Sequence, residues 1–256
     1  MKGAIIGDII GSRFEWKNLK SKKFELFDSK CRFTDDSVLS IAVAAAILEQ
    51  QPYEVKIKEY ALRYPEAGYG GTFKKWMRGE IVGPYNSWGN GSAMRVSPIA
   101  YAFQDLETVL AEAEKSAAIT HNHPEGIKGA QALAQAIFIA LYGASKAEIR
   151  EQISSLYGYD LDRTIDGIRP DYKFDVSCQG SVPEAIIAFL ESTDFEDAIR
   201  LAISIGGDSD TIASMAGALA EAFYKEIPTI IEEQAFALLT EDLLAMTKRF
   251  IDEYYT

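Results

Sequence analysis

The sequence predicts an all-α protein folded as a single domain. Apolar residues recur with helical spacing along most of the chain, whereas strand-like alternation is scarce and is best developed in residues 172–176. With 256 residues, of which 48% are hydrophobic, the chain can bury most of its apolar surface in one core. The sequence contains no linker rich in glycine, serine or proline and no internal repeat, so nothing divides it into smaller units.

The first two predicted helices differ in character. Gly3, Gly7 and Gly11 recur every fourth residue, so on a helix they form one bare ridge. We interpret this ridge as a packing surface that lets a neighbouring backbone approach closely. Residues 38–48 are nearly all apolar, which suits a helix buried on every side.

Helical patterns continue to the C-terminus with one long interruption. A helix begins near Ile212, where apolar residues follow the i, i+3, i+4, i+7 rule. Residues 157–181 are polar, contain several glycines and show no sustained period, so we expect a long loop that covers or serves a functional site. The other predicted helices span residues 54–64, 71–79, 92–103, 106–119, 124–142, 146–156, 183–191, 195–204 and 229–254.

Composition limits the possible partners and location. The formal net charge of −12 repels phosphate backbones and anionic membrane surfaces, so we expect neither nucleic acid nor a membrane as a partner. The N-terminal apolar run is broken by Asp8 and is too short for a signal peptide, and no stretch is long enough to span a bilayer. Cys31 and Cys178 lie far apart without CxxC spacing, which indicates a cytoplasmic protein; we also expect a monomer.

Two acidic motifs each precede an apolar helix. Thr34, Asp35 and Asp36 come before the helix at 38–48, and residues 208–211, of sequence Asp-Ser-Asp-Thr, come before the helix near Ile212. One interpretation is ordinary N-capping, since Ser, Thr and Asp are favoured caps. One cap needs one such residue, however, and unpaired carboxylates beside a buried helix would be costly. A metal site is the alternative, and it accounts for the carboxylates that capping does not require.

The spacing within the motifs suggests two ions. Adjacent residues on a helix diverge by about 100°, so Asp35 and Asp36 can each reach a different ion. Gly206 and Gly207 would give the second motif a non-helical turn. Oxygen ligands without His or Cys favour Mg²⁺, Mn²⁺ or Ca²⁺ over Zn²⁺. If Glu15 is added, five carboxylates balance two dications to within one charge.

Two further segments are candidates for substrate contact. Residues 88–95 place two glycines and a serine ahead of a predicted helix, with Arg95 one turn inside it; the segment is either an anion site or an ordinary turn. The only histidines are His121 and His123, followed by a Pro-Glu helix start. Substrate contact, a structural turn and metal ligation all remain open for them. No Ser/His/Asp or Cys/His set has convincing partners.

Five segments together resemble the ADP-ribosylglycohydrolase family, in particular its dinitrogenase reductase-activating glycohydrolase group. They occur in the family's order and lie between residues 3 and 217. One departure follows the last segment: many relatives are rich in glycine where this chain has residues 219–228, and we interpret Glu221 and Lys225 as surface substitutions there. The matching segments are residues 7–12 together with Glu15, 34–37, 89–95, 120–124 and 206–212.

The resemblance implies an orthogonal helical bundle with a two-metal centre, holding Mg²⁺ or Mn²⁺, at helix N-termini. Glu15 is the residue that we expect to act as acid and base, with Asp35 as the alternative. The metal ligands implied by the resemblance are Thr34, Asp35, Asp36, Asp208, Asp210 and Thr211. The implied substrate-binding residues are Gly89, Asn90, Gly91, Ser92 and Ala93 along a diphosphate and His121 near a ribose.

The implied activity is hydrolysis at C1″ of an ADP-ribosyl group carried by a protein side chain or a small molecule, with release of ADP-ribose. Two alternatives remain: a non-catalytic member of the same fold, as the lens crystallin relatives are, and a two-metal phosphoesterase. The acceptor linkage is open. We expect the cleft rim to select it, including residues 157–181 and the aromatic residues Tyr69 and Trp88.

Overall fold

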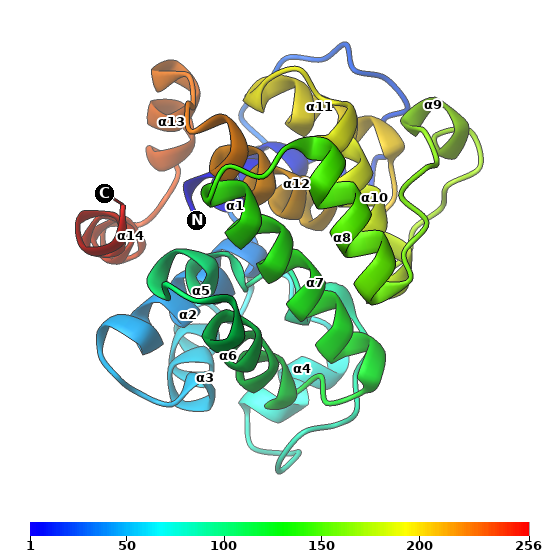
Figure 1. Cartoon of the computed structure of the whole chain (residues 1–256). Helices are drawn as coiled ribbons and strands as arrows, with labels where there is room; N and C mark the ends of the chain where they lie inside the picture. Colours follow the sequence, from blue (N-terminus) through cyan, green and yellow to red (C-terminus); the bar gives the residue numbers. More distant parts are fainter. Residues whose placement is uncertain (256) are drawn as a thin grey trace.

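The computed structural model describes residues 1–255 and confirms an all-α fold. Helices numbered α1 to α14 surround one hydrophobic core, and their axes run in several directions (Figure 1). Within these residues the single strand-type pairing is an isolated bridge between Gly89 and Ser177. None of the described helices is long and apolar enough to cross a membrane. The α-helices are α1 (Lys2–Gly11), α2 (Asp35–Leu48), α3 (Tyr53–Arg63), α4 (Gly71–Met77), α5 (Ser97–Ala102), α6 (Leu106–Ala118), α7 (Pro124–Leu141), α8 (Lys146–Tyr157), α9 (Ile165–Ile168), α10 (Cys178–Glu191), α11 (Phe195–Ile205), α12 (Ser209–Tyr224), α13 (Thr229–Phe236) and α14 (Glu241–Tyr254).

Helix α1 packs against α12 through the predicted glycine ridge, and the two lie side by side near the middle of the molecule (Figure 1). A Cβ atom on Gly3 would lie 2.1 Å from the carbonyl oxygen of Gly217, and one on Gly7 would lie 2.0 Å from that of Ala213. At the other end, a Cβ on Gly11 would lie 2.6 Å from the Cα of Asp210. The ridge therefore brings the end of α1 against the start of α12, where the second acidic motif lies.

Three predicted helices differ from the structure by more than a few residues at one end or by a division. The helix predicted at 92–103 is present as α5, but its predicted start is wrong: a 3₁₀ turn, Asn90–Ser92, comes first, and α5 begins only at Ser97. Pro98 explains this start, because proline fits the first turn of a helix and not its interior. The helix predicted from residue 183 begins at Cys178 instead, where Ser177 accepts a hydrogen bond from the Gly180 amide as its cap.

The long helix predicted at 229–254 is also wrong, since it is divided into α13 and α14. Thr240 precedes Glu241 and Asp242, an arrangement typical of a new helix start that the continuous apolar period conceals. The loop predicted at 157–181 contains the short helix α9 and the first residues of α10. Residues 172–176 form no strand.

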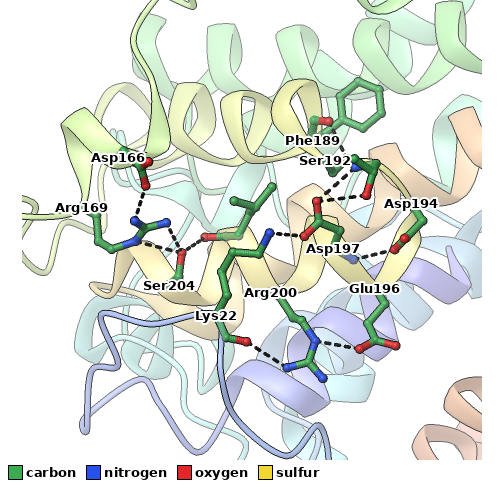
Figure 2. Close-up of polar contacts among 12 residues, drawn as sticks. Lys22, Asp166, Arg169, Phe189, Ser192, Asp194, Glu196, Asp197, Arg200 and Ser204 are labelled. Atoms are coloured by element: carbon green, nitrogen blue, oxygen red, sulfur yellow. Dashed lines mark hydrogen bonds and ion pairs between the residues drawn. The ribbon is translucent and has the colours of Figure 1, made fainter.

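Two loops are hydrogen-bonded to helix α11, and Figure 2 shows the side chains of Arg169, Arg200 and Ser204 that make these contacts. Arg200 donates to the backbone oxygens of Lys22 and Phe24 at 3.0 and 2.7 Å. Near the end of the helix, Ser204 accepts from Arg169 Nε at 3.2 Å. These bonds hold the segment after α1 and the segment after α9 against α11. Because α11 leads into the Gly206-Gly207 turn, both segments are held close to that turn.

Glu221 is buried, which corrects its interpretation as a surface substitution. Its side chain is 5% exposed, and its Oε2 accepts hydrogen bonds from the Met1 amine at 2.8 Å and from the Gly3 amide at 2.9 Å. The sequence alone does not reveal this burial, because the contact joins the start of α1 to the end of α12, and these two segments lie far apart in the chain. Lys225, at the end of α12, is exposed as expected.

Candidate functional site

The N-termini of α2 and α12 open onto one cavity of about 580 Å³. The two acidic motifs, 172 residues apart when counted from Asp36 to Asp208 (208 − 36), therefore meet in space. Thr211 Oγ1 on α12 donates to Asp36 Oδ2 on α2 at 3.1 Å. The acidic and hydroxyl residues that line the cavity are Glu15, Asp35, Asp36, Asp208, Asp210 and Thr211.

The carboxylates form two overlapping groups that could hold metal. Oxygen atoms of Asp8, Asp36 and Asp210 lie within 4.8 Å of one another, and so do those of Glu15, Asp208 and Asp210. Asp210 belongs to both groups, so the two groups adjoin each other.

Asp8 is a member of this cluster that the sequence analysis did not assign. It is fully buried on α1 and accepts hydrogen bonds from the amides of Thr34 and Ser37, at 2.9 and 3.1 Å, and from both of their hydroxyl groups. Asp8 thus fixes the first turn of α2. The available signal was an acidic residue inside an otherwise apolar helix, because such a residue is rarely buried without a partner.

Capping explains only part of the acidic motifs. Thr34 does cap α2, since its hydroxyl accepts from the Asp36 amide, and it does not itself line the cavity. Asp208 occupies the cap position of α12 but makes no capping bond. Its Oδ2 accepts instead from Asn90 Nδ2 at 2.7 Å. The remaining carboxylates are surplus to the helix ends.

The carboxylates suit a divalent cation because the protein itself leaves them uncompensated. Within residues 1–255 none of the six carboxylates forms an ion pair with a basic side chain; the six belong to Asp8, Glu15, Asp35, Asp36, Asp208 and Asp210. Asp36 Oδ1 is buried and accepts no hydrogen bond. A buried anionic oxygen without a partner is costly, and a cation would remove that cost. The donors are all oxygen atoms, as Mg²⁺ and Mn²⁺ prefer.

Crowding of the carboxylates raises their pKa values. Burial, followed by the charge of Asp208, raises the pKa of Glu15 to about 7. Burial, followed by the charge of Asp8, raises the pKa of Asp35 to about 8. Burial is also the largest cause of the raised pKa values of Asp36 and Asp210. Glu15 is half-buried at the cavity wall, where a carboxyl with a pKa near neutrality can both take up and release a proton.

The glycine-rich loop joins the carboxylate cluster along one wall of the cavity. Gly89, Asn90 and Gly91 line the cavity, and the bond from Asn90 to Asp208 connects the loop to the cluster. Ser92 and Ala93 are buried behind the wall. Ser92 Oγ donates to the Gly126 carbonyl at 2.7 Å and so ties the loop to α7.

Arg95 is among the residues that line the cavity, but one end of its guanidinium is held by the protein interior. Its side chain is fully buried, and its Nη2 donates to the Ser116 carbonyl at 2.6 Å and to Thr120 Oγ1 at 3.1 Å. Arg95 precedes α5 rather than lying inside it, so its direction differs from that of a residue one turn into a helix.

The two histidines have separate roles. His123 caps α7, because its Nδ1 accepts from the Glu125 amide at 3.1 Å, and this confirms the predicted helix start. His121 is 5% exposed and lines the cavity beside the glycine-rich loop. The pair is therefore not directed at one metal ion.

Aromatic side chains surround the mouth of the cavity. Trp16 and Phe174 are exposed and stack with their ring centres 5.2 Å apart, at an interplanar angle of 20°. Trp88 is exposed at the rim, as expected. Tyr69 is buried against Phe73, so its expected place on the rim is wrong. The Trp16–Phe174 pair was not predicted, since only the fold brings the two residues together.

The fold and the site define an all-α protein whose cleft joins a carboxylate cluster to a glycine-rich loop. The model of the family described as ADP-ribosylglycohydrolase matches residues 1–256. The chain belongs to this family and is an enzyme of the glycosyl hydrolase type.

Curated relatives and a solved structure agree with this assignment. ADP-ribosylhydrolase ARH3 of Homo sapiens is 28% identical over 84% of this chain and 77% of its own length. ADP-ribosylarginine hydrolase Tri1 of Pseudomonas putida is 26% identical over 87% of this chain and 68% of its own length. A solved structure described as an ADP-ribosylglycohydrolase-related protein complex matches with a TM-score of 0.73 and 25% identity, over 98% of this chain and 96% of the solved chain.

Proposed function

We propose that this enzyme is a metal-dependent hydrolase that cleaves the glycosidic bond at C1″ of an ADP-ribosylated protein side chain or small ADP-ribose conjugate. The observation that carries the proposal is the hydrogen bond from Asn90 to Asp208, because it joins a loop suited to phosphate with a cluster suited to metal. The names of ARH3 and Tri1, which are an ADP-ribosylhydrolase and an ADP-ribosylarginine hydrolase, support this substrate class.

Two divalent ions, Mg²⁺ or Mn²⁺, are the proposed cofactors. When bound, they would supply Lewis acidity and anchor the hydroxyl groups of the reacting ribose. The shared position of Asp210 between the two carboxylate groups supports a pair rather than one ion. Asp8 would keep the first turn of α2 in place for them. The proposed ligands are Thr34, Asp35, Asp36, Asp208, Asp210 and Thr211.

Glu15 is the proposed acid and base. The bond between C1″ and the acceptor breaks with its electron pair leaving on the acceptor, and the water oxygen forms the new bond to C1″ through an oxocarbenium-like transition state. Protonated Glu15 would donate its proton to the departing acceptor and would then take up the proton that the attacking water releases, so the carboxyl returns to its starting state. A pKa of about 7 suits Glu15 to this exchange. Asp35, with a raised pKa of about 8, is the alternative.

The proposed substrate contacts follow the glycine-rich loop. Gly89 and Gly91 lack side chains that would fill the cavity, so a diphosphate could lie against the backbone there. Ser92 and Ala93 would hold the loop from behind, and His121, which lies beside Gly89 and Gly91, would contact the same part of the substrate. The exposed Trp16–Phe174 pair lies beside Glu15 and would contact the acceptor.

The test is a panel of ADP-ribosylated arginine, ADP-ribosylated serine and small ADP-ribose conjugates, each with Mg²⁺, with Mn²⁺ and with chelator. We expect ADP-ribose to be released from at least one substrate, only when metal is present. The control variant Asp210→Asn should lose this activity, since Asp210 belongs to both carboxylate groups.

Two results would replace the proposal. Binding of ADP-ribose without release from any substrate would favour a non-catalytic member of the fold, and phosphate release would favour a phosphoesterase.

We also infer a cytoplasmic monomer without nucleic-acid or membrane partners. Sedimentation of the purified chain would test the monomeric state.

A further inference from the structure

The imidazole of His121 presents one nitrogen to the cavity without a protein partner. A Cβ atom on Gly91 would lie 3.2 Å from His121 Nε2, and one on Gly89 would lie 3.4 Å from it, so this edge of the ring faces the two glycines. Within residues 1–255 the one hydrogen bond of the His121 ring is at Nδ1, not at Nε2. Nε2 thus belongs to a side chain that is 5% exposed and lines the cavity, and it is available to a ligand.

The other ring nitrogen ends a chain of buried polar groups. His121 Nδ1 lies 2.7 Å from Thr120 Oγ1, and Thr120 Oγ1 lies 3.1 Å from Arg95 Nη2. Arg95 and Thr120 are both fully buried. Arg95 can only donate, so Thr120 Oγ1 accepts from it.

The position of each proton follows from this chain. The Thr120 hydroxyl has one proton to donate, and among the described residues its one neighbouring acceptor is Nδ1. If Nδ1 carried a proton, two N–H groups would point at one hydroxyl, and the hydroxyl proton would be buried without an acceptor, which is unfavourable. Nδ1 is therefore the acceptor, and the proton of the neutral ring lies on Nε2.

We propose that Arg95 and Thr120 are positioning residues that hold His121 in the tautomer protonated at Nε2, so that His121 donates a hydrogen bond to a substrate oxygen beside Gly89 and Gly91. The oxygen would belong to a phosphate or ribose of ADP-ribose, and this part rests on the proposed function. The tautomer itself depends only on the buried chain. Burial, followed by the charge of Arg95, lowers the pKa of His121 well below its usual value and keeps the ring neutral.

Arg95 is suited to this role because no acidic side chain neutralises its positive charge. Within residues 1–255 it forms no ion pair, and its Nε and Nη1 have no hydrogen-bond partner. Burial lowers the pKa of Arg95 to about 10, which still leaves the guanidinium charged at neutral pH. A fixed positive charge near Nδ1 disfavours a proton there and favours one on Nε2, nearer the cavity.

The tautomer can be read from long-range ¹H–¹⁵N correlation spectra of the full chain, which contains only two histidines. The variant His123→Asn assigns the signals and preserves an acceptor at the α7 cap. We expect the Nδ1 signal of His121 at the unprotonated position and the Nε2 signal at the protonated one. A protonated Nδ1 in the wild-type protein would overturn the proposal, whether or not the enzyme binds ADP-ribose.

Substitution of Thr120 tests the positioning role. Thr120→Val removes the hydroxyl but preserves the side-chain shape, so it should populate the Nδ1-protonated tautomer and weaken ADP-ribose binding about tenfold. Thr120→Ser should restore both. Unchanged spectra in Thr120→Val would contradict the role of the hydroxyl, and unchanged affinity despite altered spectra would contradict donation to the substrate. Failure of the wild-type protein to bind ADP-ribose would contradict the proposed function and leave the tautomer result standing.

Discussion

Glu15 differs from the other acidic residues of the cavity in its surroundings. It is half-buried and adjoins the exposed aromatic pair, whereas Asp36 and Asp210 are nearly inaccessible to solvent. Burial is the largest cause of the raised pKa of Glu15, and the negative charge of the neighbouring Asp208 is the second. Asp35 is the other partly exposed carboxyl of the cavity, and we propose Glu15 as the acid and base because it also adjoins the aromatic pair.

Substituting Glu15 by Gln should lower kcat by roughly 10²- to 10⁴-fold, the usual contribution of a general acid or base. ADP-ribose affinity should change little, because the amide preserves the side-chain shape and the other ligands remain. Steady-state kinetics with the preferred conjugate and titration with ADP-ribose measure the two quantities. The alkaline limb of the dependence of kcat on pH should also disappear. An unchanged kcat would mean that another residue is the acid and base, and Asp35 would be tested next.

At the scale of elements, the site depends on how closely α1 approaches α12. The glycine ridge allows backbone contact at three points, and the last of them lies at Asp210. A side chain anywhere on the ridge would separate the helices and move the start of α12 away from α2. The packing role predicted for the ridge thus has a functional consequence, since the separation of the two helix starts sets the separation of their carboxylates.

The variant Gly7→Ala should be destabilised by about 1–3 kcal/mol, because its Cβ would meet backbone atoms that cannot rotate away. In the wild-type chain that position is 2.0 Å from the Ala213 carbonyl oxygen. Urea unfolding measures the loss. Gly71→Ala is the matched control, since Gly71 begins α4 and a Cβ atom added there would have no neighbouring atom within 4 Å. Equal stability of both variants would mean that the ridge is not tightly packed.

At the scale of the whole molecule, the metal-free site opposes folding at neutral pH. A carboxyl whose pKa is higher in the folded than in the unfolded chain loses stability as pH rises through that interval. The pKa of Glu15 rises from 4.5 to about 7, and that of Asp35 rises from 3.8 to about 8. The loss from these two groups therefore begins near pH 4 and continues through about pH 8.

Thermal unfolding with and without metal should show this dependence. In chelator, Tm should fall between about pH 5 and about pH 8, and Mn²⁺ should raise Tm more at the higher pH, because bound cations replace the missing positive charge. The variant Asp210→Asn removes one shared carboxylate and should reduce both effects. A metal-induced rise in Tm that is equal at the two pH values, or equal in the variant, would contradict a carboxylate metal site.

The sequence by itself determined the helical class, most helices and the candidate motifs, because these depend on local periodicity and on residue types at fixed spacing. The helix starts at Thr34 and Asp208 could be predicted since capping residues and apolar helices adjoin in the chain. The division of 229–254 was missed because an apolar period continues across the break. The roles assigned to the motif residues remain predictions.

Only the tertiary structure decided which distant residues meet. It placed Asp8 beside Thr34, turned Arg95 toward Thr120, buried Glu221 against Gly3 and stacked Trp16 on Phe174. The physical reason is the same in each case. Burial and hydrogen bonding between segments far apart in the chain depend on helix packing, which local periodicity does not encode, and that packing converts two sets of helix-start residues into one cavity.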